Sequence, residues 1–293
     1  MNWKLAGMAG TALSVIALSG VSFAGANKFT GNVSLAVGQT FQDDLGGVFD
    51  DSYTSISGDA KLNVAFSNNI NLQLNFAGTG GFADESIPGF SLDRDAGFQA
   101  SANVYYRNGQ YAVGLFGGAG ISSGAQFGPI DDAEYYFVGA QGQYYWNNFT
   151  FGLEGGYLDS SADVPAGPDD VFLNNAWFAN AEVRWYATPK FALTANLGYI
   201  SGEAFVGNAD VDTIHWGAKA EYWPEEKEPL SLWVAYEGRT TEADFSPGSV
   251  DKDTHTVKIG VTFHFGTDGG KIENDRSGPA FNQMDYGAIV VGG

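Results

Sequence analysis

The sequence is poor in several residue types that stabilise or tether other proteins. It contains no cysteine, nine prolines among 293 residues, and 14 lysines and arginines against 34 aspartates and glutamates. An exported chain of this length without disulfides must be held together by a large core or by a sheet that closes on itself. The net charge of −20 argues against nucleic acid as a partner, because the protein would repel phosphate.

Long apolar runs are also missing. Beyond the first 26 residues, no window approaches the ~18 uninterrupted apolar residues of a transmembrane helix. Residues 1–26 combine one early cation, Lys4, with a short apolar stretch at 5–18, and they end in Ala24 and Ala26, spaced as a signal peptidase requires. The stretch is too short for an anchor, so we predict a cleaved secretory signal over residues 1–26.

The rest of the chain is rich in glycine and aromatic residues and shows a period of two. Apolar residues occupy every second position in twelve segments, with glycine, amide, hydroxyl or charged residues between them. These segments are 29–37, 56–66, 70–76, 98–106, 111–115, 136–146, 149–157, 177–185, 191–199, 214–222, 230–236 and 257–265. They predict twelve β-strands.

The connections between these segments alternate in length. Short turns lie at 67–69, 107–110, 147–148, 188–190 and 224–229, and their Asn-Asn and Asn-Gly pairs suit tight hairpins. The other six connections, at 42–55, 79–95, 121–134, 159–173, 201–212 and 241–253, are long and acidic. Bacterial outer-membrane barrels have short periplasmic turns and longer extracellular loops.

The two faces of the predicted strands differ in a way that fits a membrane. One face is polar and carries charges, whereas the other is apolar and ends beside the short turns in aromatic residues such as Tyr144, Trp146 and Trp185. Aromatic residues at strand ends form girdles at the water–lipid interface. An open sheet edge cannot satisfy its hydrogen bonds in hydrocarbon, so the sheet must close. We therefore predict an all-β fold: a 12-stranded antiparallel transmembrane β-barrel over residues 27–265, with short periplasmic turns and long acidic extracellular loops.

On these features the chain resembles the Gram-negative outer-membrane β-barrel, or porin-like, proteins. The resemblance covers residues 27–265 and is most specific in the last strand, which ends with Phe263 and Phe265. It implies location in the outer membrane, contact with its lipid and lipopolysaccharide, and recognition of Phe263 and Phe265 by the barrel insertion machinery. The sequence departs from the family pattern because residues 266–293 follow Phe265. We expect them to form a mobile periplasmic tail, and re-entry of the tail into the barrel is the alternative.

The charged residues of the polar face are the candidate functional residues. They are Asp59, Lys61, Glu154, Glu182, Arg184, Lys219, Glu221, Glu237, Arg239 and Lys258. One interpretation is a pore lined by both signs, which would orient and select small polar solutes. The other is an internal ion-pair network that fills the barrel, since twelve strands lie between filled barrels and open channels. Inward aromatic residues fit both, because they could narrow the bore or stack on sugar rings.

Neither an enzyme nor a cofactor or metal site is indicated. His215 and His264 fall on the polar face, His255 lies beside a loop, and no serine is suitably placed to pair with a lipid-facing base. Paired carboxylates in the acidic connections could bind divalent cations that bridge the loops to lipopolysaccharide, or they could simply form a solvated rim. No run of these carboxylates has the spacing of a calcium-binding loop. Both interpretations predict a mouth that prefers cations.

A cluster of small outward residues suggests a contact between protomers. It comprises Ala100, Gly117, Ala119, Ala140 and Gly142. Local curvature of the barrel explains the same cluster equally well. We therefore predict a porin-like channel for passive diffusion of small hydrophilic solutes, and the alternative is a non-conducting structural or surface-interaction barrel.

Overall fold

The computed structural model describes residues 28–44, 49–66, 69–82, 96–123, 133–162, 173–204, 209–224, 229–245, 248–267 and 270–292. The predicted signal, with Ala24 and Ala26, and large parts of the acidic connections lie outside these ranges. The cleavage site and the loop chemistry therefore stay predictions.

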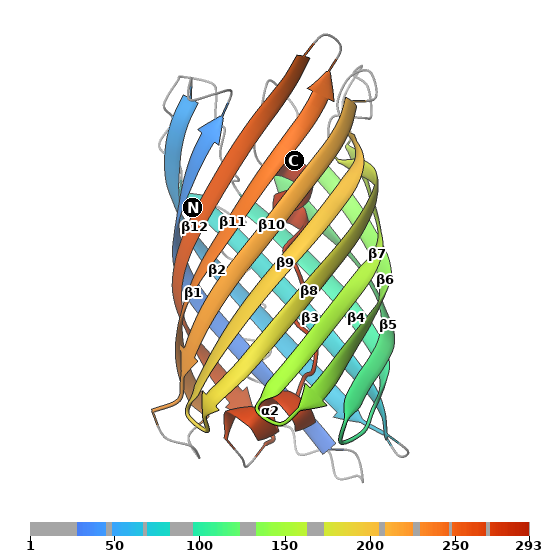
Figure 1. Ribbon diagram of the computed structural model, residues 1–293, viewed down its shortest axis with the longest axis vertical. Helices are drawn as coiled ribbons and strands as arrows, with labels where there is room; N and C mark the ends of the chain where they lie inside the picture. Colours follow the sequence, from blue (N-terminus) through green and yellow to red (C-terminus); the bar gives the residue numbers. More distant parts are fainter. Residues whose placement is uncertain are drawn as a thin grey trace, which may run out of the picture.

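Twelve strands form one closed antiparallel barrel, which confirms the predicted fold (Figure 1). The strands are β1 (Lys28–Asp44), β2 (Phe49–Ala65), β3 (Ile70–Phe82), β4 (Ala96–Arg107), β5 (Tyr111–Ser123), β6 (Ala133–Trp146), β7 (Phe149–Ala162), β8 (Asn174–Thr188), β9 (Phe191–Ala204), β10 (Ala209–Tyr222), β11 (Leu230–Phe245) and β12 (Gly248–Phe265). Each strand pairs with its neighbours in the chain, and β12 pairs with β1 in a register that sets Val37 opposite Ile259. Closure leaves no unpaired edge in the hydrocarbon layer.

The outer wall is apolar and is bordered by aromatic residues at both ends. Beside the short turns, Trp146 and Trp185 each stack on Phe149. We call this the short-turn end of the barrel. Aromatic residues also lie toward the opposite end, called here the far end, where Tyr136 and Tyr199 donate hydrogen bonds to Asp159 and Asp212. Amphipathic aromatic residues at two levels match the two interfaces of a bilayer, so the outer membrane is the location of the protein.

The strands at the far end are longer than the sequence pattern predicted. The connection expected at 241–253 is largely strand, because β11 continues to Phe245 and β12 begins at Gly248. The connections expected at 42–55 and 201–212 are shortened in the same way by β1, β2, β9 and β10. Polar residues interrupt the apolar alternation here, but the backbone ladder continues because it satisfies the main-chain N–H and C=O groups.

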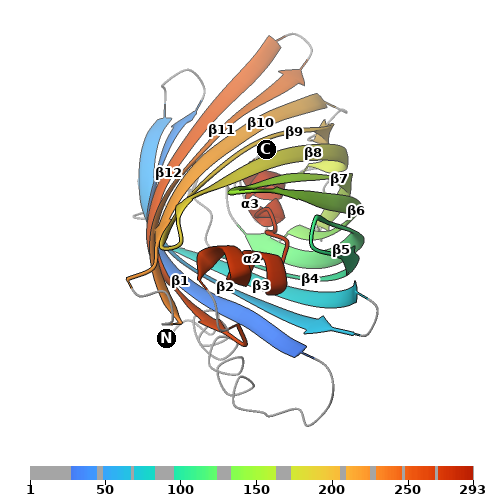
Figure 2. The same cartoon turned by 60° about the horizontal axis from the view of Figure 1, so that its bottom comes forward.

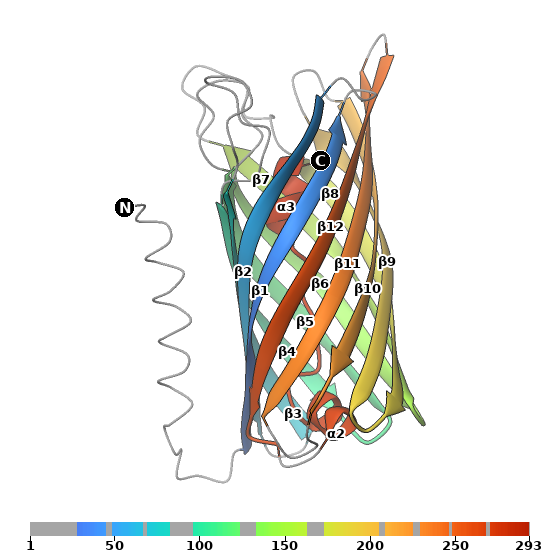
Figure 3. The same cartoon turned by 90° about the vertical axis from the view of Figure 1, so that its left-hand side faces the viewer.

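The tail does not extend away from the barrel, so the predicted mobile extension is wrong. After β12, helix α2 (Lys271–Ser277) lies across the short-turn end, and the chain then runs up the lumen to helix α3 (Tyr286–Gly292) (Figures 2 and 3). The alternative of re-entry is the one the structure supports. Neither of these two described helices is long and apolar enough to span a membrane.

Candidate functional site

Buried charges at the short-turn end hold α2. Its Lys271 Nζ lies 3.1 Å from a carboxylate oxygen of Glu221, and its Asp275 lies 3.0 Å from the guanidinium of Arg184. Lys271 and Asp275 also pair with each other at 2.9 Å across one helical turn. Burial alone would raise the pKa of Asp275, but the adjacent Arg184 and Lys271 cations lower it to about 2. A buried ion pair with several partners resists separation, because each charge that loses its partner stays desolvated.

Arg276 ties α2 to the turn between β6 and β7. Its guanidinium donates to the carbonyl oxygens of Asn147 and Phe149, at 2.7 and 2.9 Å, and lies over the ring of Tyr145. On the other side, His264 Nδ1 is 3.1 Å from Asn274 Oδ1. The helix is therefore anchored to β6, β7, β8, β10 and β12 at the level of the turns.

An extended segment, residues 278–285, follows α2 along the wall of β3 to β6. Arg107 donates to the carbonyl oxygens of Ser277 and Gly278, and Gln143 donates to that of Ala280 at 2.7 Å. The amide of Gln73 donates to the carbonyl of Phe281 at 2.8 Å and accepts from its N–H at 3.3 Å.

The amide of Gln99 bridges the next part of the tail in a related way. It donates to the carbonyl oxygen of Met284 at 2.7 Å and accepts from the N–H of Tyr286 at 3.2 Å. These glutamines lie on strands that carry few lumen charges, so the wall presents amides to the backbone of the tail. Wall side chains bind the carbonyl oxygens of five residues from Ser277 to Met284 and the N–H groups of Phe281 and Tyr286.

Helix α3 completes an apolar cluster in the lumen toward the far end. Tyr286 stacks on Phe137 with a centroid distance of 4.2 Å and lies 5.1 Å from Phe178. Ile289 and Val290 are buried in the same cluster. Inward aromatic residues here pack against the tail, so this half of the barrel is filled.

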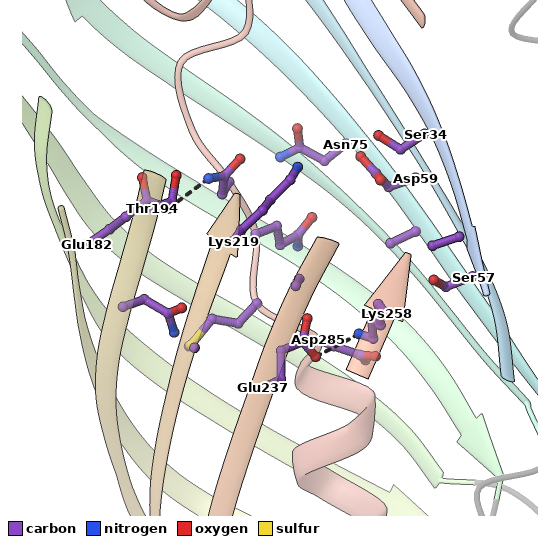
Figure 4. Close-up of a pocket in the computed structure, with 18 of the residues that line it drawn as sticks. Ser34, Ser57, Asp59, Asn75, Glu182, Thr194, Lys219, Glu237, Lys258 and Asp285 are labelled. Atoms are coloured by element: carbon purple, nitrogen blue, oxygen red, sulfur yellow. Dashed lines mark hydrogen bonds and ion pairs between the residues drawn. The ribbon is translucent and has the colours of Figure 1, made fainter. Parts of the chain in front are cut away.

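The lumen also keeps an open cavity of about 460 Å³, which is bordered by the tail and most extensively by β10, β11, β12, β1 and β2, with further lining residues on β3, β4 and β6 to β9 (Figure 4). Ser34, Asp59, Lys219 and Asp285 are among the groups that face it. Lys258 Nζ lies 2.6 Å from Glu237, and Lys219 Nζ lies 4.5 Å from the centroid of the Trp233 ring. The cavity is thus polar, contains both charge signs, and extends along the barrel from α2 toward the far end.

All ten charged residues that the sequence placed on the lumen face line this cavity. They divide between the two interpretations that the sequence left open. Glu221 and Arg184 belong to the ion-pair network that holds α2, whereas Asp59 and Lys219 border open space. Glu182 bridges both groups, because it pairs with Arg184 and accepts a hydrogen bond from Asn282 of the tail.

Phe263 and Phe265 lie at the end of β12, where Phe265 stacks on Phe29 of β1. Their predicted role in insertion stays a prediction. The five small residues of the predicted protomer contact lie on β4, β5 and β6.

The wall residues that bind the tail could not be recognised from the sequence pattern. Gln73, Gln99, Gln143 and Arg107 look like ordinary lumen residues in the alternation of β3, β4 and β6. One signal was present in the tail: Lys271 and Arg276 lie close to Glu273 and Asp275, and an apolar run follows at 288–291. A segment with equal numbers of positive and negative charges followed by an apolar run differs from the acidic connections.

Neither a protein-family model nor a curated protein matches this sequence. In structure the chain is similar to an outer membrane channel from Pseudomonas putida F1, with a TM-score of 0.51 and 13% identity, covering 80% of this chain and 95% of that one. It is also similar to the KdgM porin in complex with disordered oligogalacturonate, with a TM-score of 0.44 and 11% identity, covering 79% and 99%.

A third similarity is to a loop-deleted form of OmpT, an outer membrane protein of Vibrio cholerae, with a TM-score of 0.43 and 14% identity, covering 82% and 100%. At these identities the likeness concerns the fold alone. The closed barrel with its apolar outer wall and aromatic borders defines the chain as an outer-membrane β-barrel protein.

Proposed function

We propose that the protein is an outer-membrane channel for small hydrophilic solutes, and that they pass between the docked tail and the wall of β10 to β2. The observation that carries this proposal is the polar cavity of about 460 Å³, which the docked tail leaves open in the lumen. A cavity of this size has room for a file of water molecules. Charged residues of both signs line it, and such linings orient polar solutes and weaken their binding enough to permit exit.

Acidic residues at the far end support a preference for cations. Asp210, Asp212, Glu242, Asp244 and Asp251 lie on the extensions of β10, β11 and β12. These carboxylates lie on the exposed face of three neighbouring strands, and their negative charge raises the local concentration of cations near this end of the barrel. We propose that the far end is extracellular and that the short turns and the start of β1 face the periplasm.

A recording in a planar bilayer tests the proposal. The folded protein should give small, steady currents, and a salt gradient should give a reversal potential of the sign expected for cation selectivity. The double variant Glu237→Gln, Arg239→Gln removes one charge of each sign from the cavity lining and should change the size of the current while the fold is kept. Absence of current from correctly folded protein would refute the channel.

That negative result would favour the second candidate, a non-conducting barrel. Its specific support is the apolar cluster around α3, which fills the β5 to β10 side of the lumen. Bilayer recordings distinguish the two, because a filled barrel gives no current in either the original protein or the double variant.

We also propose that the small outward residues form a contact between protomers. A methyl group added at Gly117 would have no neighbour closer than 3.5 Å within the protomer, and one at Gly142 none closer than 3.6 Å. The surface is therefore recessed, and small residues of this kind allow close approach of membrane-embedded backbones. Cross-linking in native membranes, compared between the original protein and Gly117→Phe, tests this proposal.

A further inference from the structure

The tail binds to the lumen wall mainly through its own backbone. We define the tail seat as Arg107, Gln143, Gln73 and Gln99, which make hydrogen bonds to main-chain atoms of residues 277–286. Further along, Arg239 donates to the carbonyl oxygen of Ala288 at 2.7 Å. Every residue except proline offers the same backbone groups, so a surface that binds them tolerates many sequences.

Selectivity in the seat comes from two aromatic positions. Phe281 packs edge-on against Tyr105 with a centroid distance of 5.1 Å, and Tyr286 enters between Phe137 and Phe178. Both side chains are buried. The seat therefore combines backbone recognition with two pockets for aromatic residues five positions apart, which is the arrangement of a peptide-binding groove.

The polar side chains of the same segment contribute less. Asn282 contacts Lys61 and Glu182, and Gln283 accepts a hydrogen bond from Ser101. These contacts lie on the cavity side, where Asn282 and Gln283 border open space. Replacing them would leave the backbone contacts and both aromatic pockets in place.

We infer that the tail seat is a binding site for extended peptides, that the tail is its resident occupant, and that peptides with two aromatic residues five positions apart are its ligand class. The inference deepens the proposed function, because such peptides would be the solutes that the lumen recognises. Covalent attachment gives the tail a high effective concentration, so a free peptide binds measurably only after the tail is detached.

The experiment detaches the tail after folding. A protease site inserted between Thr267 and Gly270 allows the full chain to fold before the connection is cut. A fluorescent peptide of residues 270–292 is then added to the cut protein in detergent micelles, and its binding is followed by anisotropy. We expect the labelled peptide to replace the resident tail and to be displaced by unlabelled peptide.

N-methylation of single peptide bonds then tests whether the backbone is what the seat binds. A methyl on the nitrogen of Phe281 removes the donor to Gln73 and should weaken binding about tenfold or more, since the buried glutamine oxygen loses its partner. The matched control is N-methylation at Gln283, whose N–H has no hydrogen bond among the described residues. This control should bind within about twofold of the unmodified peptide.

Side-chain variants complete the test. A peptide with Asn282→Ala and Gln283→Ala should still bind, whereas Phe281→Ala with Tyr286→Ala should lose most of its affinity. Three results would each overturn the inference. They are equal losses of affinity for the two N-methyl peptides, failure of the Asn282→Ala, Gln283→Ala peptide to bind, and no exchange of the cut tail for the labelled peptide. Absence of current in the bilayer recording would refute the channel but would not affect peptide binding. Failure of the channel proposal and failure of the peptide-binding proposal are therefore distinguishable.

Discussion

At the scale of single residues, the lumen depends on glycines that accept aromatic rings from the neighbouring strand. A Cβ atom at Gly139 would lie 2.6 Å from the ring of Phe116, and one at Gly118 would lie 2.5 Å from that of Phe137. Real Cβ atoms do not approach so closely, so the rings lie flat on the wall only because these positions lack a side chain. The flattened rings in turn leave space for the tail, since Phe137 stacks on Tyr286.

We therefore expect Gly118→Ala to destabilise the barrel by about 1–3 kcal/mol, because the added methyl group would clash with the backbone carbonyl oxygen of Ala100 as well as with the Phe137 ring, and both must shift. The matched control is Gly117→Ala on the outer face of the same strand, where the nearest atom is 3.5 Å away. Urea unfolding in micelles, followed by tryptophan fluorescence, measures both. Equal stability of the two variants would contradict this account of the glycine.

Asp275 gives the docking of α2 a dependence on pH. It faces Arg184 of β8, Lys271 of its own helix and Glu221 of β10, and its pKa is lowered from 3.8 to about 2. A carboxyl group with a lowered pKa contributes stability above its ordinary pKa, and this contribution is lost as the pH falls through the lowered value. Docking of α2 should thus be fully stable above about pH 4 and should weaken toward pH 2.

The stability of α2 docking can be measured by hydrogen exchange of residues 271–277 as a function of pH, corrected for the intrinsic exchange rate. In the variant Asp275→Asn, the dependence between pH 4 and 2 should become smaller, and what is left comes from the pair that Lys271 still forms with Glu221. An unchanged pH profile in the variant would show that another group controls docking.

At the scale of elements, the strands and the tail differ in how far local pattern determines them. Each strand was predictable because alternation over five or more residues defines which side faces lipid, and all ten lumen charges followed from that parity. The tail was not predictable in this way. Its helices have seven residues each, too few for a periodic pattern, and its partners Glu221 and Arg184 come from strands distant in sequence.

The anchoring of α2 can be tested with a double-mutant cycle on Lys271 and Glu221. Lys271→Met alone leaves Glu221 buried beside an apolar group and should weaken docking by roughly 3 kcal/mol. Glu221 would keep Lys219 at 3.6 Å but lose its nearest cation, so adding Glu221→Gln removes a poorly compensated charge and should recover part of that loss. Protease sensitivity of the tail, at fixed protease concentration, measures docking in each variant. Additive losses would show that the two residues do not act as a pair.

At the scale of the whole molecule, the tail fills part of the lumen and leaves part of it open. Apolar packing around α3 fills the space beside β5 to β10 toward the far end, and ion pairs fix α2 across the short-turn end. The remaining cavity is bordered on one side by the tail, so the position of the tail determines the width of the proposed path. A closed barrel predicted from sequence therefore does not by itself specify a bore, because residues outside the strands set it.

Because the sequence contains no cysteine, introduced cysteine pairs can test whether the position of the tail determines the width of the path. Ser101 of β4 and Gln283 of the tail are joined by a hydrogen bond of 3.0 Å that runs through the end of the glutamine side chain. Because this side chain spans part of the distance between the two backbones, a short bis-methanethiosulfonate reagent, rather than a direct disulfide, joins Ser101→Cys to Gln283→Cys and fixes the tail to the wall. Local release of a docked segment is an opening event that such a link prevents. We expect the cross-linked variant to give only small, uniform current steps, and cleavage of the link by a reductant to add rare larger steps when the tail leaves its seat.

The matched control places a disulfide within the barrel wall. Ser34 and Thr262 lie opposite each other on β1 and β12, with hydroxyl groups 2.8 Å apart, and both face the cavity. Their cysteine pair alters the lumen surface but not the tail, so its step sizes should be the same before and after reduction. Larger steps that persist in the cross-linked Ser101–Gln283 variant would show that the path widens without release of this segment. The tail would then be a fixed lining of the channel.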